Sequence, residues 1–399
     1  MSTNRQLFLT HLAPTSDAPL LLEIEKASGV ELHGKNGKKW LDLISGISVS
    51  NVGHCHPDVV RAVTDQAALY MHLMVYGELV QSPQVAFAKA LTEQLPPTLQ
   101  SCYLVNSGSE AIEGAMKLAK RYTGRHEIVA FNNAYHGSTQ GALSIIGSEY
   151  FRNSFRPLLP SIQHLEFNNT SDLNRITNQT ACVIVEVVQG EAGAITPGDG
   201  YMQEIARVCH DTKALLVIDE IQTGFKRTGP FMAFMDYAVV PDILVLAKGM
   251  GGGMPLGAFI SSGAIMSTLA HNPVLGHITT FGGHPVSCAA ALAALKIVLA
   301  MEEKEILIKG ELFRKLLVHP SIKSVTGKGL LLGVEFESEA LNKKIIDQCI
   351  ADGLFTDWFL FAPHKMRIAP PLIINDHQIF MACEIILKAI EKCTKHVKN

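Results

Sequence analysis

Between residues 100 and 265 the chain alternates short apolar runs with helix-like segments, and this alternation constrains its fold more than any other feature. The apolar runs are CYLVN (102–106), EIVAFN (127–132), CVIVEVV (182–188), ALLVIDE (214–220), DILVLAK (242–248) and AFISS (258–262). Helical patterns lie between them, for example at 110–122 and 201–211. Continuous apolar runs predict strands buried on both faces, and their alternation with helices predicts a mostly parallel α/β sheet.

The two ends of the chain have a different pattern. Residues 20–50 predict a β-meander with GKNGKK as its turn. After about residue 290 come a long helix, strands within 327–337 and a final helix at 376–396. We therefore expect a large central domain at 51–290. A smaller α+β domain is expected from residues 1–50 together with residues 291–399.

The composition argues against several classes of partner. Hydrophobic residues make up 47% of the 399 residues and charged residues 18%, which is typical of a compact domain. A net charge of −3 without a basic tract before Lys392 predicts no nucleic-acid binding. The longest apolar helix candidate, 289–301, is interrupted by Lys296 and is too short to span a bilayer, so we expect no membrane partner.

The N-terminus and the cysteines indicate the compartment. The first residues lack a charged segment followed by a sustained apolar one, so we expect no signal peptide. Eight scattered cysteines without a CxxC pair are typical of reduced thiols in the cytoplasm. GHCHP (53–57) suggests a metal site, but neighbouring side chains on a tight turn rarely converge on one ion. We expect no metal there, and a helix entry at His56-Pro57-Asp58.

Lys248 is the residue that fits worst in its surroundings. It ends the apolar run ILVLA and precedes a glycine-rich turn, and a buried ammonium costs several kcal/mol unless it is paired or neutralised. Asp219 ends the apolar run LLVID, and it too needs a cationic partner to stay ionised. At neighbouring strand ends, the lysine and the aspartate could pair with each other or hold opposite ends of a flat, electron-poor ring. For Asp219 and Glu220, a helix cap or a structural salt bridge is the alternative.

Two further segments follow strands. In NSGSEA (106–111), a strand runs into a helix whose backbone N–H groups and serine hydroxyls would form a cradle for phosphate, although serines also cap ordinary helices. In NAYHG (133–137), an aromatic side chain could stack on a ring or simply belong to a turn. Neither segment is a P-loop. The turn after Lys248 is no dinucleotide fingerprint, because Met254 replaces its third glycine.

Six blocks, in this order, resemble the class III (omega) aminotransferases. They are SGSEA, YHG, VVQGEAG (187–193), IDEIQTGFKRTG (218–229), LAKGMGGGMPLGA (246–258) and TTFGGHPVSCAAAL (279–292). These enzymes use pyridoxal 5'-phosphate and have fold type I, and the ornithine and acetylornithine aminotransferases are the most similar members. The match runs from about residue 20 to 375. It implies a mostly parallel seven-stranded sheet in the large domain and a small α+β domain from both termini.

The resemblance also implies roles for individual residues. Lys248 would form the imine (Schiff base) with the cofactor aldehyde and, as a free amine, shuttle the proton. Asp219 would keep the pyridine nitrogen protonated. The other cofactor-binding residues that it implies are Ser107, Gly108, Ser109, Tyr135, His136, Glu186, Gln222 and Thr280. Thr280 would reach across from a partner subunit, which implies a homodimer with shared active sites.

For the substrate, the resemblance implies a carboxylate site at Arg367. Glu191 would cover this arginine while a terminal amine reacts and swing away when a 2-oxo acid binds. Tyr76 lies where such enzymes place a substrate-facing tyrosine. The alternatives are a surface salt bridge for Arg367 and ordinary packing for Tyr76. Relatives usually carry a carboxylate-binding arginine where this chain has Ser138.

The departure at Ser138 leaves two possibilities. Either Arg152 or Arg156 replaces that arginine, or the substrate lacks the carboxylate. The resemblance implies an aminotransferase that moves an amino group from an amino acid or ω-amino donor, ornithine- or acetylornithine-like, to a 2-oxo acid such as 2-oxoglutarate. A mutase, racemase or decarboxylase on the same cofactor is the alternative within the fold. A nicotinamide-dependent oxidoreductase and a catalytically silent binding protein are more distant alternatives.

Overall fold

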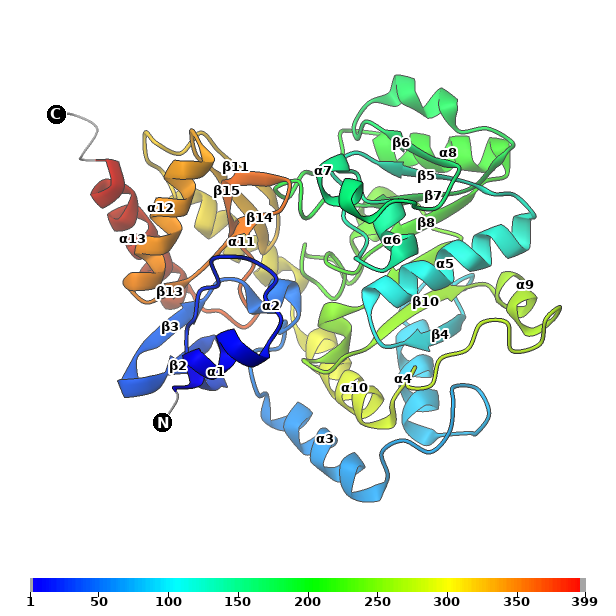
Figure 1. The fold of residues 1–399 in the computed structure, drawn as a ribbon, viewed down its shortest axis with the longest axis horizontal. Coiled ribbons are helices and arrows are strands. Elements are labelled where there is room, and N and C mark those ends of the chain that lie inside the picture. The colour runs from blue at the N-terminus through cyan, green and yellow to red at the C-terminus, as the bar shows by residue number, and fades with distance from the viewer. Residues whose placement is uncertain (1–2, 395–399) are drawn as a thin grey trace.

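The protein, a computed structural model that describes residues 3–394, consists of two lobes (Figure 1). The larger lobe, on the right in Figure 1, is built on a seven-stranded sheet. Its strands are, in spatial order, β4 (Ser101–Val105), β10 (Gly257–Ser261), β9 (Ile243–Leu246), β8 (Leu215–Asp219), β7 (Thr180–Glu186), β5 (Glu127–Phe131) and β6 (Ile162–Leu165). β10 runs antiparallel to the other six strands, which are all parallel to one another. The predicted mostly parallel α/β sheet is thereby confirmed.

Each of the six apolar runs overlaps one strand of this sheet. All seven residues of β7 are buried, as a continuous apolar run predicts for a strand covered on both faces. Successive residues of β7 face opposite sides, so Val183 and Val185 belong to one core and Cys182 and Ile184 to the other. The seventh strand, β6, was not predicted, because its sequence IQHL is short and half polar.

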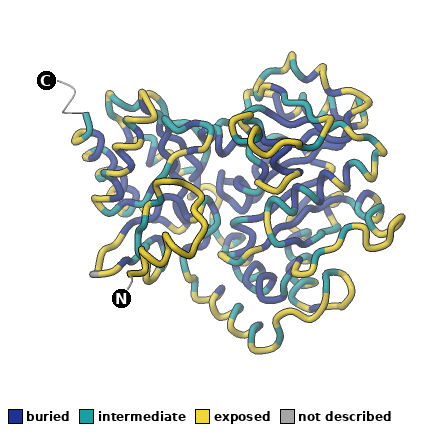
Figure 2. The backbone as a smooth tube through the Cα atoms, in the orientation of Figure 1, coloured by how far each residue is buried: buried dark blue, intermediate teal, exposed yellow. Residues whose placement is uncertain are grey.

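Helices cover both faces of the large sheet and fill the smaller lobe. The α-helices are α1 (Asn4–His11), α2 (Ser45–Ser48), α3 (Pro57–Leu69), α4 (Ser82–Thr92), α5 (Gly108–Thr123), α6 (Gln140–Ser144), α7 (Glu149–Arg152), α8 (Tyr201–Thr212), α9 (Gly263–Met266), α10 (Pro285–Ala300), α11 (Glu303–Leu316), α12 (Glu339–Ala351) and α13 (Asp376–Thr394). One face packs against α3, α4, α8 and α10, and the other against α5 and α6. Figure 2 shows buried backbone inside both lobes.

The smaller lobe joins the two ends of the chain. Its strands form two four-stranded sheets, one with β1 (Ile24–Ser28), β2 (Glu31–Gly34), β3 (Lys39–Asp42) and β13 (Leu354–Phe355), the other with β11 (Ser324–Lys328), β12 (Leu331–Glu335), β15 (Ala362–Ile368) and β14 (Trp358–Phe359). The predicted meander is β1 to β3, and the short 3₁₀ helix Lys35–Gly37 occupies its predicted turn. The parallel pairing of β13 with β3 ties the C-terminal part to the N-terminal part.

The packing of the helices bears on the proposed division into domains. One hydrophobic core contains Trp40 from the N-terminal part together with Phe313 and Ile386. The core of the large sheet includes α10 as far as Val298, and Met301 touches both cores. The boundaries at residues 50 and 290 stay a prediction. On this packing we propose Met301 as the second boundary.

Arg227 is a buried cation that connects the two lobes. Its guanidinium donates hydrogen bonds to the backbone oxygens of Leu330 (3.0 Å) and Pro370 (2.5 Å) in the smaller lobe. It also binds the side-chain oxygens of Ser45 and Asn51 at 3.2 and 2.6 Å. Burial lowers the pKa of Arg227 to about 9, although the charge of Asp42 opposes this. Every named partner is neutral, so hydrogen bonds carry this connection.

The segment GHCHP forms polar contacts of its own. His54 binds the carboxylate of Asp42 at 2.7 Å, and the His56 side chain caps the predicted helix entry at Pro57. Within residues 3–394 no group of three or more His, Cys, Asp or Glu side chains could hold a metal ion. In the same range no single helix is long and apolar enough to cross a membrane. The pair α10 and α11, bent by 77°, passes on length and composition alone.

Candidate active site

A cavity of about 480 Å³ opens at the edge of the large sheet where the parallel strands end. Such edges collect ligands in open α/β sheets. The predicted site residues that line the cavity are Ser107, Gly108, Ser109, Tyr135, His136, Glu186, Asp219, Gln222 and Lys248. Lining residues that were not predicted individually are Val49, Asn106, Gly137, Ile221, Ala247, Gly253, Met254, Pro255 and Leu256. These are mostly apolar or next to a predicted residue, so only adjacency to the predicted segments would have indicated them.

Lys248 follows β9 and opens the tight turn that the glycines predict. It has a left-handed backbone with φ of 47°, which is uncommon for a residue with a side chain, and Gly252 and Gly253 have φ of 62° and 101°. A Cβ on Gly249 would lie 2.6 Å from the side chain of Asn51. Burial lowers the pKa of the Lys248 amine, and the charges of nearby carboxylates only partly offset this. Among the described residues no carboxylate forms a direct ion pair with it.

Asp219 finds its cationic partner in His136. Nδ1 of His136 lies 2.7 Å from Oδ2 of Asp219, and the backbone N–H of Ile221 donates to Oδ1 at 2.9 Å. Burial alone would lower the pKa of His136, but the hydrogen bond and charge of Asp219, with the charge of Glu186, raise it overall. Nε2 of His136 is buried without a hydrogen-bond partner. An unpaired buried polar atom of this kind, beside a cavity, is a natural contact for a ligand.

Glu186 and Glu220 are two buried carboxyls near Asp219. Burial raises the pKa of each to about 7. Glu186 lines the cavity and accepts hydrogen bonds from the N–H groups of Tyr135 (3.3 Å) and Gly190 (3.2 Å). As predicted for consecutive strand residues, Glu220 diverges from Asp219, and it binds the Thr223 hydroxyl and a backbone N–H instead.

The N-terminus of α5 closes one end of the cavity. Ser107 is its N-cap, and its Oγ accepts a hydrogen bond from the N–H of Glu110 at 3.2 Å. This hydroxyl therefore caps the helix, which was the alternative to phosphate binding. Backbone N–H groups at the start of a helix still favour an anion. A Cβ on Gly137 would lie 2.1 Å from Oγ of Ser109, so only glycine lets the two segments approach this closely.

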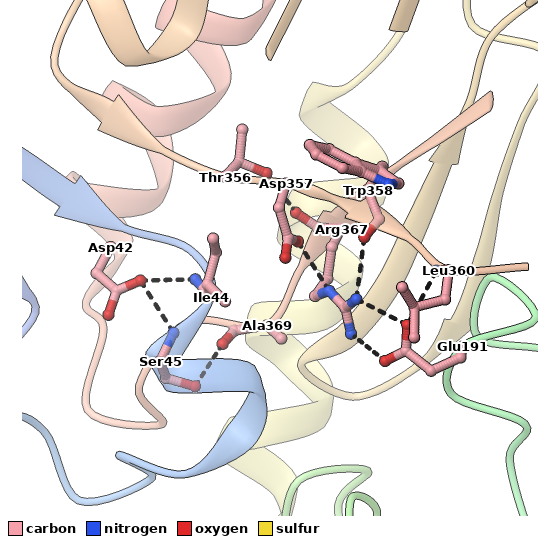
Figure 3. Close-up of polar contacts among 10 residues, drawn as sticks. All are labelled: Asp42, Ile44, Ser45, Glu191, Thr356, Asp357, Trp358, Leu360, Arg367 and Ala369. Carbon is pink, nitrogen blue, oxygen red and sulfur yellow. Dashed lines mark hydrogen bonds and ion pairs between the residues drawn. The ribbon is translucent and has the colours of Figure 1, made fainter. Parts of the chain in front are cut away.

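Arg367, on β15 of the smaller lobe, and Glu191, in the segment that follows β7 of the large sheet, form a buried ion pair (Figure 3). Nη1 and Nη2 of Arg367 donate to the two carboxylate oxygens of Glu191 at 2.8 and 3.0 Å. Nε donates to Asp357 at 2.8 Å, and Nη2 also reaches the backbone oxygen of Trp358 at 3.0 Å. Arg367 is 1% exposed, so the pair is no surface salt bridge. Glu191 shifts the pKa of Lys248 upward, so its charge reaches the cavity.

Like Arg367 and Glu191, four further residues named in the sequence analysis lie outside the cavity lining. Tyr76 donates its hydroxyl to the backbone oxygen of Cys102 at 3.1 Å and packs on Tyr103 with ring centres 4.6 Å apart. These contacts match the packing alternative, and a substrate role stays a prediction. Thr280 is exposed. Arg152 and Arg156 both bind the carboxylate of Glu149.

A mostly parallel sheet, a lysine and an aspartate at neighbouring strand ends and an anion cradle together fit a pyridoxal-phosphate-dependent enzyme, and solved structures of transaminases share this fold. The solved ornithine aminotransferase from Toxoplasma gondii superimposes with a TM-score of 0.92 at 28% identity, covering 98% of this chain and 94% of that one. An (S)-enantioselective omega-transaminase from Thermomicrobium roseum gives 0.88 at 29% identity, covering 98% and 97%.

The chain belongs to the class-III aminotransferase family, whose model matches residues 12–390. An acetylornithine aminotransferase from Methanopyrus kandleri is 36% identical over 368 residues, which cover 91% of this chain and 92% of the relative. One from Haemophilus ducreyi is 35% identical over 399 residues, covering 97% and 98%. The protein is therefore a pyridoxal-phosphate-dependent aminotransferase, and the oxidoreductase and silent-binding alternatives fall away.

Proposed function

We propose that the enzyme moves an amino group from an amino acid or ω-amino donor to a 2-oxo acid, with Lys248 and Asp219 at the centre of the reaction. The observation that supports this most is their position at the ends of the adjacent strands β9 and β8, facing one cavity beside the N-terminus of α5. Ornithine and acetylornithine, the compounds in the relatives' names, are the first donors to test. 2-Oxoglutarate is the acceptor that the sequence resemblance implies.

The residues that line the cavity fit the cofactor. The volume lies in the range of small-molecule sites, and Nε2 of His136 and Nε2 of Gln222 are buried without partners. We propose that Asp219 holds the ring nitrogen, Tyr135 stacks on the ring, Gln222 binds its phenolic oxygen, and Ser107 to Ser109 bind the phosphate. When bound, pyridoxal phosphate supplies an aldehyde that exchanges with amines and a ring that takes up electrons.

In this proposal Lys248 bonds to the cofactor and moves the proton. Its lowered pKa keeps a larger fraction of the amine uncharged near neutral pH than an exposed lysine would have. An uncharged amine can accept a proton from the substrate carbon and return it to a neighbouring carbon. The cost of burying the ammonium is thus reduced.

Asp219 has the complementary task of keeping a negative charge beside the ring nitrogen. His136 supports it, because a hydrogen bond from the imidazole fixes the carboxylate and stabilises its charge. His136 is in this sense a positioning residue that also faces the cavity. Glu186, with its raised pKa, stays partly protonated and adds less competing charge.

Substrate carboxylates are proposed to bind at Arg367. With Glu191 in place the guanidinium is neutralised, which suits a donor whose terminal amine reacts. When a 2-oxo acid arrives, its carboxylate replaces that of Glu191 in the same bidentate geometry. One cavity would then serve both halves of the reaction.

We further propose a homodimer in the cytoplasm. Thr280 is exposed and does not line the cavity of its own chain, as expected if it completes the phosphate site of a partner subunit. The free cysteines are compatible with a reducing compartment.

The test is stoichiometric amino transfer. The purified enzyme is supplied with pyridoxal phosphate, an amine or amino-acid donor and either 2-oxoglutarate or pyruvate, and the amino acid formed is measured against the donor consumed. One mole of product per mole of donor supports the proposal. A donor that is converted with no 2-oxo acid consumed would instead indicate the mutase, racemase or decarboxylase alternative.

A further inference from the structure

The number of cations near the cavity limits how many carboxylates a substrate can carry. A buried carboxylate needs a cation or several N–H donors, since an unpaired one is strongly disfavoured. Among the described residues that line the cavity, Lys248 is the one lysine or arginine, and it is committed to the cofactor in the proposed function. Arg367 adds one carboxylate site behind Glu191. A second substrate carboxylate therefore requires a further arginine.

The two arginines of the segment after α6 do not supply it. Nη2 of Arg152 binds Glu149 at 2.8 Å, and its Nη1 lies 3.2 Å from Nε2 of His164, within the large lobe. Nη2 of Arg156 binds the other oxygen of Glu149 at 2.5 Å. One carboxylate thus binds both guanidiniums, and neither arginine lines the cavity.

The side of α7 that faces the Arg367 site is aromatic. The ring of Phe151 meets that of Phe361 edge-on, with centres 5.4 Å apart. The backbone N–H of Phe361 donates to the backbone oxygen of Glu191 at 3.0 Å, so this contact lies beside the Glu191–Arg367 pair. Side chains one position apart on a helix point about 100° apart, which turns Arg152 away when Phe151 faces Phe361. On this side of Glu191, α7 therefore supplies an aromatic ring and no second cation.

Ser138 contacts two residues that line the cavity. Its Oγ lies 3.0 Å from the hydroxyl of Tyr135, which lines the cavity, and its backbone N–H donates to Oγ of Ser109 at 3.3 Å. Ser138 is exposed, so a longer side chain has room there. A pair of neutral hydroxyls can bind a polar group but gives little discrimination in favour of a carboxylate.

From these contacts we infer that the site binds one substrate carboxylate, at Arg367, and that Ser138 is the position that excludes a second. The acceptors are then 2-oxo monocarboxylic acids, and the preferred donors are primary amines with no carboxylate at the far end, or amino acids with a single carboxylate. This inference rests on the proposed function and narrows its substrates. Of the two possibilities left open by the departure at Ser138, it selects the second: neither Arg152 nor Arg156 replaces the arginine of the relatives, and the substrate lacks the second carboxylate.

Matched substrates test the inference directly. Pyruvate is compared with 2-oxoglutarate as acceptor, and pentylamine with 5-aminopentanoate as donor, because the members of the second pair differ at one end only. We expect kcat/KM to favour pyruvate and pentylamine by at least about tenfold. A tenfold preference for 2-oxoglutarate or 5-aminopentanoate would overturn the inference. This holds whether the cation for the second carboxylate came from the same subunit or from its partner in the proposed dimer. If no pair transfers an amino group, the proposed function itself fails.

Variants locate the effect at position 138. Ser138→Arg is expected to raise the ratio of kcat/KM for 2-oxoglutarate over pyruvate by at least about tenfold, and Ser138→Gln, of similar length but neutral, leaves the ratio unchanged. Arg156→Gln is expected to leave both values unchanged. The dissociation constants of glutarate and butyrate, measured by calorimetry, test the same preference without turnover. A ratio that does not respond to Ser138→Arg, or that falls in Arg156→Gln, contradicts the assignment.

Discussion

The side chains of Arg367 and Glu191, 176 positions apart in the sequence, meet in a bidentate ion pair that is almost completely buried. Asp357 holds the third nitrogen, so Arg367 stays fixed when Glu191 moves. Removing one partner of a buried pair leaves an uncompensated charge and typically costs 3–5 kcal/mol. In the proposed function a substrate carboxylate takes the place of Glu191, and the pair acts as a gate.

Replacing Glu191 by glutamine should open this gate. The neutral amide competes less well for Arg367, so the KM for a 2-oxo acid is expected to fall by about tenfold while donors with a terminal amine react more slowly. Arg367→Lys is the control, because it keeps the charge but loses the two parallel hydrogen bonds, and its KM should rise. Steady-state kinetics with each substrate varied separately give both values. An unchanged or higher KM in Glu191→Gln would contradict the gate.

His136→Asn should weaken cofactor binding. Nδ1 of the imidazole supports the carboxylate of Asp219 at 2.7 Å, and hydrogen bonds to charged groups contribute about 1.5–3 kcal/mol. The dissociation constant of pyridoxal phosphate is expected to rise by about 10- to 100-fold. Absorbance titration of the apoenzyme with the cofactor measures this constant. Asp219→Asn should be more severe, since it removes the charge itself. Equal affinity in the wild type and His136→Asn would show that the histidine does not position Asp219.

The buried carboxyl of Glu220 should make stability depend on pH. Its pKa is raised to about 7 in the folded chain, against an ordinary value of 4.5. Between these values the folded state holds a proton that the unfolded state has released, so the free energy of unfolding falls as pH rises. The contribution is at most about 3 kcal/mol.

Glu220→Gln removes this titration; its amide oxygen still accepts from the N–H of Phe234, and its NH2 group can donate to the hydroxyl of Thr223. Urea denaturation of the wild type and the variant should therefore show a difference that grows in favour of the variant from pH 5 to pH 8. Parallel stability curves over that range would mean that Glu220 does not titrate there.

Much of the fold could be predicted from the sequence because its strands are continuously apolar. β7 and β9 are buried on both faces, and such runs have few alternatives. β6 escaped prediction since an edge strand with a Gln and a His lacks that signal. The short strand β13 exists only because the two ends of the chain pair, which no local pattern reveals. The strand β14 pairs with its neighbour β15, but its two residues are too few to give a pattern.

The site was predictable where residues follow strands. Lys248 and Asp219 stand out because a charge ends an apolar run. The partner of Asp219 was not foreseeable in the same way, since His136 lies 83 positions earlier and any of several cations could have met it. Arg227 likewise gave no signal, because its partners are backbone oxygens and neutral side chains brought together by the tertiary fold.

The central claim is that Lys248 bonds to the cofactor and carries the transfer. The most direct measurement is borohydride reduction of the holoenzyme, followed by proteolysis and mass spectrometry. The cofactor mass is expected on the peptide that contains Lys248, and Lys248→Arg, which keeps the cation but cannot form the bond, should lose both the label and turnover. A label on another lysine, or a Lys248→Arg variant that turns over at the wild-type rate, would contradict the account.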